Sequence, residues 1–418
     1  MRIGVVRTQV PFVTGGAERH AAGLVSALRS YGHEATEITL PFKWYPVETL
    51  TDSILAAKLT DLTEAEGVPL DMMIGLKFPA YLARHPNPVF WLIHQHRQAY
   101  DMWDAGTSDL LDDPDGMTAR DMIKGEDRAA FGRSTRPIYA NSQNVAGRLQ
   151  KYLGLASKAL YHPPPLAERL TQGSYGNYLF APGRLNPSKR VDLMLRALAK
   201  TPAHLRLVLA GVPENPAYLD ELRSLAAALG IASRVEWLGG IDDASMIRYY
   251  AEARAVVFTP LDEDLGYITL EAMLSGKAVI TTTDAGGPLE FITNRAEGLI
   301  TSPSAEALAH AFTEVGEDVS LAERMGGAGL AHYQGLDISW EHVVETLTGE
   351  TAKAQPGPAQ IAALEAIAAA LPAAASVARV QAAIAPPAPP PLPFASITEV
   401  LEAYTFDTLP FEEAGGSA

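Results

Sequence analysis

Short apolar runs alternate with longer segments of helical spacing along most of the chain. The first apolar run, residues 3–6, precedes the paired glycines Gly15 and Gly16, and residues 21–30 then carry apolar side chains at helical spacing. Such alternation is typical of a parallel sheet that helices cover on both faces. The other strands that this pattern predicts in the first half are residues 34–40, 72–75, 89–93, 137–140 and 159–161.

The alternation starts again after the triple proline at 163–165 and the polar segment 171–176, which we interpret as the domain boundary. The second unit has expected strands at 178–182, 206–210, 235–238, 255–259 and 278–281 and expected helices at 190–199, 218–229, 244–252 and 267–275. The sequence therefore predicts an α/β protein with two Rossmann-like lobes, residues 1–165 and 166–335. We expect its ligand in the cleft at the carboxyl ends of the strands.

The last part of the chain, residues 351–418, is rich in alanine and proline and reads as a linker. Beyond the proline run, Ser396 and Glu399 form a capping-box pattern, and apolar residues follow at helical spacing. We expect residues 396–405 to form a short amphipathic helix that docks on a protein partner or a second subunit. The alternative, an extension with a fraying helix, stays open.

Composition limits the classes of partner. The chain has 418 residues with a net charge of -16, which disfavours binding to nucleic acid or to an anionic membrane surface. The absence of cysteine excludes disulfides and thiolate metal sites and fits a reducing compartment. No apolar run is long enough to suggest a transmembrane segment, and the start of the chain lacks the features of a signal peptide. We therefore expect a cytoplasmic protein.

The segment EDLGYITLE at 263–271 is the most informative candidate for chemistry. Glu263 lies in a loop after a predicted strand, Gly266 opens a helix, and Glu271 lies within that helix. Free amides at a helix start suit a diphosphate, and the flanking carboxylates could accept hydrogen bonds from sugar hydroxyls. The alternative is an ordinary pair of solvated acids.

Basic residues occur at another predicted strand end, in GRLNPSKRVD at 183–192. Arg184 can bind phosphate oxygens with its planar fork, and Lys189 adds a movable positive charge. Gly15 and Gly16 allow a ligand close to the backbone at the first helix start, although the G-x-G-x-x-G spacing of a dinucleotide fold is missing. For each of these segments, a solvated surface or a plain tight turn is the competing interpretation.

Two further groups lie after predicted strands. His94 and His96 follow residues 89–93, and we do not expect them to share a metal ion. We favour a hydrogen-bonding role for His94, with a structural role as the alternative. The aromatics in FKWYP at 42–46 could stack on sugar rings, although packing in a core or lobe interface is the stronger interpretation.

Taken together, GGAERH at 15–20, GRLNPSKRVD at 183–192 and EDLGYITLE at 263–271 resemble the motifs of retaining family 4 glycosyltransferases, which have the GT-B fold and an E-x7-E motif. The resemblance covers about residues 1–348. It includes ISWEHVVETL at 338–347, which is similar to the last helix of the family, so residues 336–350 are expected to cross back to the first lobe. Leu265 stands where the family often has phenylalanine, but the following glycine is kept.

This resemblance implies a retaining transfer of a sugar from a nucleotide diphosphate sugar to a hydroxyl of an unidentified acceptor, with no metal and no separate cofactor. It implies that Arg184 and Lys189 hold the diphosphate, while Glu271 holds the ribose and Glu263 the transferred sugar. It also implies that His94 is the active-site histidine, with His96 as the alternative. The other residues expected at the donor are Gly16, Gly211, Gly239, Gly266 and Tyr267.

Two other functions remain open at this stage. A nucleotide-sugar epimerase can share the fold but needs an acid and base pair, for which the chain offers only Glu263 and the histidines. A degenerate transferase could act as a binding scaffold through its tail. A glycosidase is disfavoured, because two carboxylates leave the basic pair and the glycine turns unexplained.

Overall fold

The computed structural model describes residues 1–13 and 15–351. Residues 1–165 form an N-terminal lobe around a parallel sheet in the order β2-β1-β5-β6-β7-β8. Its strands are β1 (Arg2–Gln9), β2 (Glu34–Pro41), β5 (Met72–Lys77), β6 (Pro88–His94), β7 (Ile138–Ala140) and β8 (Ser157–Ala159). A small antiparallel pair, β3 (Glu64–Ala65) and β4 (Val68–Pro69), lies beside it.

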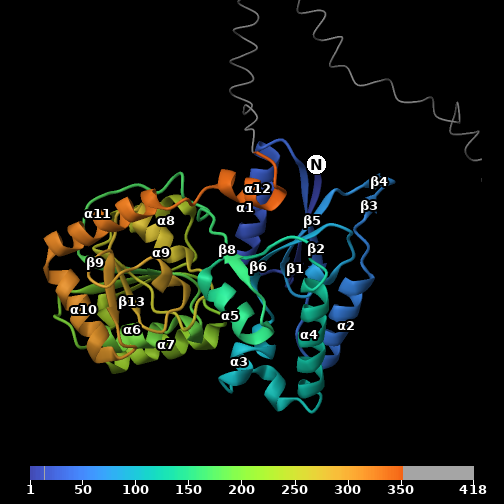
Figure 1. Cartoon of the computed structure of the whole chain (residues 1–418). Helices are drawn as coiled ribbons and strands as arrows, with labels where there is room; N and C mark the ends of the chain where they lie inside the picture. Colours follow the sequence, from blue (N-terminus) through green and yellow to red (C-terminus); the bar gives the residue numbers. More distant parts are fainter. Residues whose placement is uncertain (14, 352–418) are drawn as a thin grey trace, which may run out of the picture. The chain divides into compact units, whose positions relative to one another are not determined.

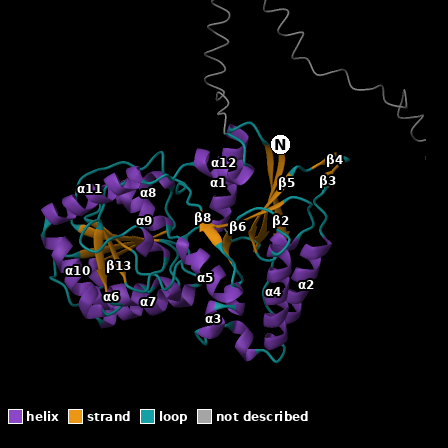
Figure 2. Ribbon diagram, in the orientation of Figure 1, coloured by secondary structure: helices purple, strands orange, loops and turns teal. Residues whose placement is uncertain are grey.

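Helices cover both faces of this sheet, as the alternating pattern predicts (Figures 1 and 2). One face packs against α1 (Gly16–Ser30) and α12 (Trp340–Thr348). The other face packs against α2 (Val47–Leu59), α4 (Gly116–Phe131) and α5 (Gln143–Leu153), with the short α3 (Asp101–Asp104) nearby. Helix α12 belongs to the second half of the chain but buries Val343, Val344 and Leu347 against the first sheet.

The C-terminal lobe, residues 166–335, has a second parallel sheet in the order β11-β10-β9-β12-β13-β14. The strands are β9 (Tyr178–Pro182), β10 (Arg206–Ala210), β11 (Val235–Gly239), β12 (Ala255–Val257), β13 (Val279–Thr282) and β14 (Gly298–Thr301). The helices are α6 (Val191–Leu198), α7 (Pro216–Ala228), α8 (Asp243–Glu252), α9 (Tyr267–Leu274), α10 (Ala305–Glu317) and α11 (Val319–Gly335).

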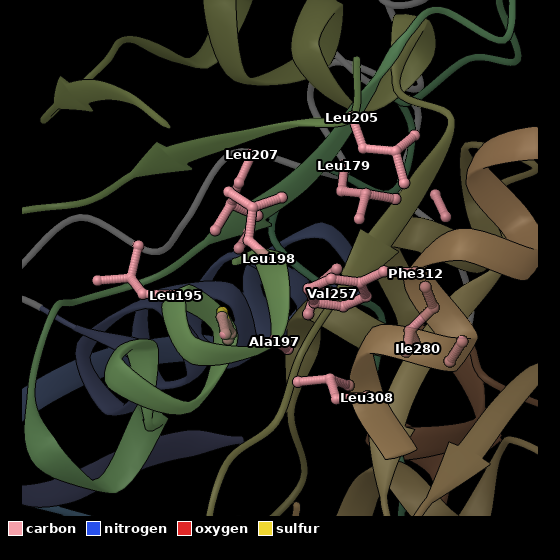
Figure 3. Close-up of a cluster of buried hydrophobic side chains, with 14 of the residues drawn as sticks. Leu179, Leu195, Ala197, Leu198, Leu205, Leu207, Val257, Ile280, Leu308 and Phe312 are labelled. Atoms are coloured by element: carbon pink, nitrogen blue, oxygen red, sulfur yellow. The ribbon is translucent and has the colours of Figure 1, made fainter. Parts of the chain in front are cut away.

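Figure 3 shows the larger core of this lobe, where leucines of β9, β10 and α6 meet Leu308 and Phe312 of α10. Helices α8 and α9 contribute to the core on the opposite face of the sheet. Successive residues of each strand point to opposite faces of the sheet, and both faces are buried under helices. The strands are therefore nearly continuous apolar runs in the sequence.

Several predicted bounds were wrong by a few residues. The first helix begins at Gly16 instead of residue 21, because the Glu18 carboxylate accepts a hydrogen bond from the Gly15 amide and caps the earlier start. The strand expected at 159–161 occupies 157–159, and the strand expected at 255–259 ends at Val257. The helix expected at 190–199 begins at Val191, because Arg190 has a left-handed conformation.

The strand orders define the topological switch point of each lobe. At this point the connections that follow two neighbouring strands run in opposite directions along the sheet. In the C-terminal lobe it lies between β9 and β12, and in the N-terminal lobe between β1 and β5. Open parallel sheets bind ligands outside the carboxyl ends of such strands. The loops that follow β9 and β12 contain Lys189 and Glu263. In the N-terminal lobe, the loop after β1 leads to Gly16 at the start of α1, and β5 ends at Lys77.

None of the described helices combines the length and the hydropathy that a membrane span requires. The cytoplasmic location expected from the sequence stays a prediction. The docking helix expected at 396–405 and almost all of the 351–418 tail lie outside the described residues.

A buried carboxyl group ties α4 to the segment after β6. The Asp127 carboxylate of α4 accepts hydrogen bonds of 2.7 Å from the hydroxyls of Tyr81 and Tyr100, and all three side chains are buried. Burial raises the pKa of Asp127 to about 7, although the two tyrosine donors oppose the change. This contact fixes the segment that leads from His94 and Arg97 into α3.

We expect stability to depend on the protonation of Asp127. Its raised pKa means that the folded chain binds this proton more tightly than the unfolded chain, so the stabilisation present below about pH 4 is lost as pH rises to about 7. Asp127→Asn should flatten this decline in the free energy of unfolding, which is on the order of 4 kcal/mol. Urea unfolding at pH 5 and pH 8 measures it, and an unchanged pH slope in the variant would contradict the assignment.

Candidate functional site

The loop after β12 holds Glu263 opposite a lysine from the loop after β9. The Lys189 ammonium and the Glu263 carboxylate form an ion pair, with side chains that are only about one-fifth to one-quarter exposed. The backbone at Glu263 is equally fixed: its amide donates to the Ala285 carbonyl at 2.8 Å, and its carbonyl accepts from the Gly287 amide at 2.8 Å. Two residues that the sequence placed in one site are therefore in direct contact.

Gly266 provides the turn that starts α9. It has a φ of 85°, and a Cβ at this position would lie 2.9 Å from the Phe258 ring and 3.1 Å from Pro288. A larger residue would be strained in both backbone and packing. Gly266 is the N-cap of α9, so the first amides of this helix lie next to it.

Glu271 lies within α9 and is almost fully buried, at 9% exposure. One of its carboxylate oxygens accepts a 2.6 Å hydrogen bond from the Tyr250 hydroxyl of α8. Burial raises the pKa of Glu271, and the positive charge of Arg19 in α1 opposes that change. The described residues give its second oxygen no hydrogen-bond donor, so that oxygen can accept one from a ligand.

Gly16 and Tyr267 bring the two lobes together at the start of their helices. A Cβ built on Gly16 would lie 3.6 Å from the Tyr267 ring, so the exposed glycine already borders the aromatic face. The Tyr267 hydroxyl shares a 2.6 Å hydrogen bond with Nε2 of His162, and its burial raises its pKa. The Tyr267 side chain therefore contacts Gly16 and His162, which precede α9 in the chain. Its expected place beside the donor stays a prediction.

Arg184 and Lys77 supply positive charge from opposite lobes. Arg184, just after β9, is exposed and its side chain forms no hydrogen bond or ion pair with any described residue. Lys77 ends β5 and pairs in register with His94 on β6. Burial lowers the pKa of Lys77, and Arg184 is among the cations that lower it further. The sequence did not single out Lys77, although its place at the end of an apolar run was a usable signal.

The two histidines differ in their surroundings. His94 is the last residue of β6, and its Nδ1 lies 2.6 Å from the Gln95 carbonyl oxygen. Burial lowers its pKa, while the charge of Asp264 acts in the opposite direction. His96 lies beyond the end of β6, and its buried ring packs 5.2 Å from Phe78 and 6.1 Å from Phe42. Burial lowers the pKa of His96 to about 3, consistent with a structural residue.

Two arginines of the N-terminal lobe form ion pairs with the acidic residues on both sides of Glu263. Arg148 of α5 is buried and forms ion pairs with Asp264 and, at 2.8 Å, with Asp262. Arg97 contacts Asp262 at 3.2 Å and Asp264 at 3.8 Å. The pKa of Asp264 falls to about 2 because these arginines and His94 outweigh its burial. We call Arg97, Arg148, Asp262 and Asp264 the interlobe clamp.

The glycines expected near the base have different environments. A Cβ on Gly211 would lie 1.8 Å from the Gly183 carbonyl oxygen, so backbone packing alone requires glycine there. Gly239 has a φ of 65° with open space around its Cβ position, and its carbonyl accepts from the Gly211 amide at 2.8 Å. The two are neighbours at the ends of β10 and β11, but their contact with a donor stays a prediction.

A cavity of about 1060 Å³ is lined by residues of both lobes. Arg19 of α1 and Trp340 of α12 lie on one side, and Tyr267 and Asp243 lie at the starts of α9 and α8 on the other. Its volume is close to the upper end of the range of about 300–1,000 Å³ that small-ligand sites occupy. No group of three or more metal-ligating side chains occurs among residues 1–13 and 15–351, and metal independence stays a prediction.

The sequence of the C-terminal lobe matches a family profile. Residues 168–331 match the sequence profile described as "Glycosyl transferases group 1". We call residues 168–331 the group 1 domain after the profile that they match. This match supports the resemblance to glycosyltransferases, whereas retention, the E-x7-E motif and the roles of the two glutamates stay predictions.

Named relatives of the group 1 domain are themselves transferases. A lipopolysaccharide core biosynthesis mannosyltransferase of Rhizobium leguminosarum is 32% identical over 183 residues, which is 42% of this chain and 51% of the relative. A D-inositol 3-phosphate glycosyltransferase of Nocardia farcinica is 32% identical over 173 residues, 40% of this chain and 38% of the relative. The chain thus spans about half or less of the length of these relatives.

Solved structures extend the likeness to both lobes. The HepE protein of Anabaena, solved with UDP and glucose, has a TM-score of 0.63 at 17% identity, covering 84% of this chain and 100% of that one. Sucrose-phosphate synthase from Thermosynechococcus elongatus has a TM-score of 0.65 at 18% identity, covering 83% and 97%. At these identities the likeness shows the fold, and the GT-B fold expected around the group 1 domain is confirmed.

We expect loss of the interlobe clamp to destabilise the chain. Arg148→Ala would leave Asp264, whose side chain is 19% exposed, with Arg97 as its remaining arginine partner, so the loss should be below the cost of removing one partner of a fully buried pair, about 3–5 kcal/mol. The variant should unfold at lower temperature than the wild type in a calorimetric scan. Lys151→Ala, an exposed position on the same helix, is the matched control. Equal unfolding temperatures for the two variants would show that the clamp adds no stability.

Proposed function

We propose that the chain is a retaining glycosyltransferase that moves a sugar from a nucleotide diphosphate sugar to an acceptor hydroxyl without a metal ion. The observation that carries this proposal is the pairing of Lys189 with Glu263 at the switch point of the group 1 domain, with Arg184 just after β9 in the same domain. The names of the relatives, a mannosyltransferase and a glycosyltransferase, support transfer as the reaction class. The UDP and glucose bound in the Anabaena structure support a nucleotide-sugar donor.

The diphosphate needs local positive charge in a chain whose net charge is -16. Arg184 has no described ion-pair partner and can bind phosphate oxygens through two parallel hydrogen bonds. Lys189 can reach the same oxygens by exchanging its carboxylate partner, and Lys77 adds charge from the other lobe. The start of α9 adds backbone amides next to Gly266.

The two glutamates would accept hydrogen bonds from opposite ends of the donor. Glu271 has one oxygen held by Tyr250, which orients the other for a ribose hydroxyl. Glu263, released by Lys189, would accept from hydroxyls of the transferred sugar. His94 stays neutral near pH 7 because burial lowers its pKa, so it can hydrogen-bond a sugar hydroxyl without adding charge.

The reaction proceeds by attack on the face from which the diphosphate leaves. The bond between the anomeric carbon and the diphosphate oxygen breaks, and a bond to the acceptor oxygen forms on the same face. The acceptor proton passes to a departing phosphate oxygen, so the protein needs no separate base. Arg184 and Lys189 stabilise the negative charge that develops on the diphosphate.

Transfer is favoured over the two alternatives. An epimerase needs an acid and a base on either side of one sugar carbon, and the packing of His96 against Phe42 and Phe78 leaves only Glu263 and His94 of the expected candidates for that pair. The names of the relatives, which are transferases, also speak against a scaffold without a donor site.

We expect donor binding to depend on the two basic residues of the group 1 domain. Arg184→Ala and Lys189→Ala should each weaken nucleotide binding about 10- to 100-fold, because a hydrogen bond to a charged group contributes about 1.5–3 kcal/mol. The measurement is a thermal-shift titration with UDP-, GDP- and ADP-sugars, and Arg196→Ala, an exposed position on α6, is the control. Equal shifts in all variants would place the donor elsewhere.

A substitution of Glu263 separates recognition of the sugar from binding of the nucleotide. Glu263→Gln keeps the shape but removes the charge, so it should lower the transfer rate by 10-fold or more while nucleotide affinity changes by less than about 3-fold. The rate is followed by nucleotide release with acceptor present, and NMR of the product identifies its anomeric configuration. An inverted product, or an epimerised donor formed without acceptor, would contradict the proposal.

A further inference from the structure

The aromatic segment after β2 forms a pocket that the donor site does not use. The pocket has a volume of about 400 Å³ and includes the half-buried Trp44 and the exposed Tyr45 in its lining. The other lining residues are Val10, Pro11, Pro41, Phe42, Lys43, Thr49 and Ser53. The interpretation of these aromatics as packing residues is confirmed for Phe42, which is buried, and for Trp44, which is partly buried against the same core, whereas Tyr45 is exposed.

Its place in the fold puts this pocket at the same sheet edge as the candidate site. Pro41 ends β2 in register with Gln9 of β1, and the Phe42 amide donates to the Gln9 carbonyl at 2.9 Å. The loop after β1 leads from Val10 in the pocket to Gly16 beside Tyr267. The Phe42 ring separates the pocket from His96, two residues after His94.

The aromatic walls are held in fixed orientations. The Trp44 indole nitrogen donates to the Asp109 carboxylate at 3.2 Å, and the Gln98 amide donates to the same oxygen at 3.0 Å. Trp44 and Tyr45 meet edge to face, with ring centroids 5.2 Å apart at 78°. Tyr45 nevertheless remains 56% exposed, which leaves a preoriented aromatic face open at the surface.

Polar groups line the same pocket beside these rings. The Lys43 ammonium lies 4.9 Å from the Tyr45 ring centroid and forms no ion pair with the described residues. The Thr49 side chain has no described hydrogen-bond partner, and Ser53 contributes a second hydroxyl. Aromatic faces with hydroxyl and ammonium groups around them match a pyranose ring, which has an apolar face and a polar rim.

We infer that this pocket is an acceptor subsite that binds a pyranoside ring of a saccharide against Trp44 and Tyr45. The inference rests on the proposed function, because a saccharide bound here needs a donor at the neighbouring site to be glycosylated. It assigns the acceptor a chemical class: a sugar whose ring stacks on the aromatic pair while another part extends past Phe42 toward His94.

The test measures saccharide binding and transfer separately with the full chain. Saturation-transfer NMR with methyl glycosides of glucose, mannose, galactose and N-acetylglucosamine, each with and without UDP, detects the subsite. Tyr45→Ala and Trp44→Ala should weaken binding of the responsive glycoside about 10-fold. Tyr45→Phe should retain binding, because it keeps the stacking face, and Leu55→Ala, an exposed α2 residue outside the pocket, is the control.

The outcomes separate this inference from the proposed function. If UDP binds but no glycoside does, or if the aromatic variants bind glycosides as the wild type does, the subsite is wrong while the donor site stands. Binding of an isoprenyl phosphate in place of every glycoside would also overturn it. If glycosides bind and the variants lose them while no nucleotide binds, the saccharide site stands and the transferase proposal fails. Tyr45→Ala decides the matter should Trp44→Ala not fold, since Tyr45 is exposed.

Discussion

Three consecutive carboxylates, Asp262, Glu263 and Asp264, must be neutralised within one loop, and the candidate site depends on how this is done. Like charges at such short spacing repel each other unless each has a partner. Arg97 and Arg148 neutralise the outer two from the N-terminal lobe, while Lys189 of the C-terminal lobe takes the middle one. These ion pairs therefore contribute both to the loop geometry, which backbone hydrogen bonds to Ala285 and Gly287 also fix, and to the association of the lobes.

In the proposed function, this division of partners makes Glu263 the carboxylate that can exchange its partner for a ligand. Asp264 is mostly shielded from solvent and held by Arg148, and its pKa falls to about 2, so it remains ionised and paired across the physiological range. Lys189 carries its charge on a flexible stem and can move to a phosphate oxygen without disturbing the interlobe clamp. The clamp keeps the loop in place during that exchange.

The sequence was sufficient to predict residues that follow strands of one lobe. Lys189 and Glu263 could be placed together because the strands before them were readable as apolar runs, and carboxyl ends of parallel strands share an edge. Arg148 could not be predicted, because its contact with Asp264 spans 116 residues and two lobes, and a helical arginine has no distinct local pattern. Lys77 could not be predicted either, because its position beside His94 follows from the register of β5 and β6.

Glycines and buried acids show a second limit on prediction. Gly211 was expected at the donor, yet its need for glycine follows from contact with the Gly183 carbonyl, so packing and ligand approach give the same sequence signal. Glu271 was expected to accept a ribose hydroxyl, and its burial makes that role more demanding. The Tyr250 hydroxyl donates to one of its oxygens, and the described residues give the other no hydrogen-bond donor. In the proposed function, a ribose hydroxyl would donate to this second oxygen, while Tyr250 holds the carboxylate in place.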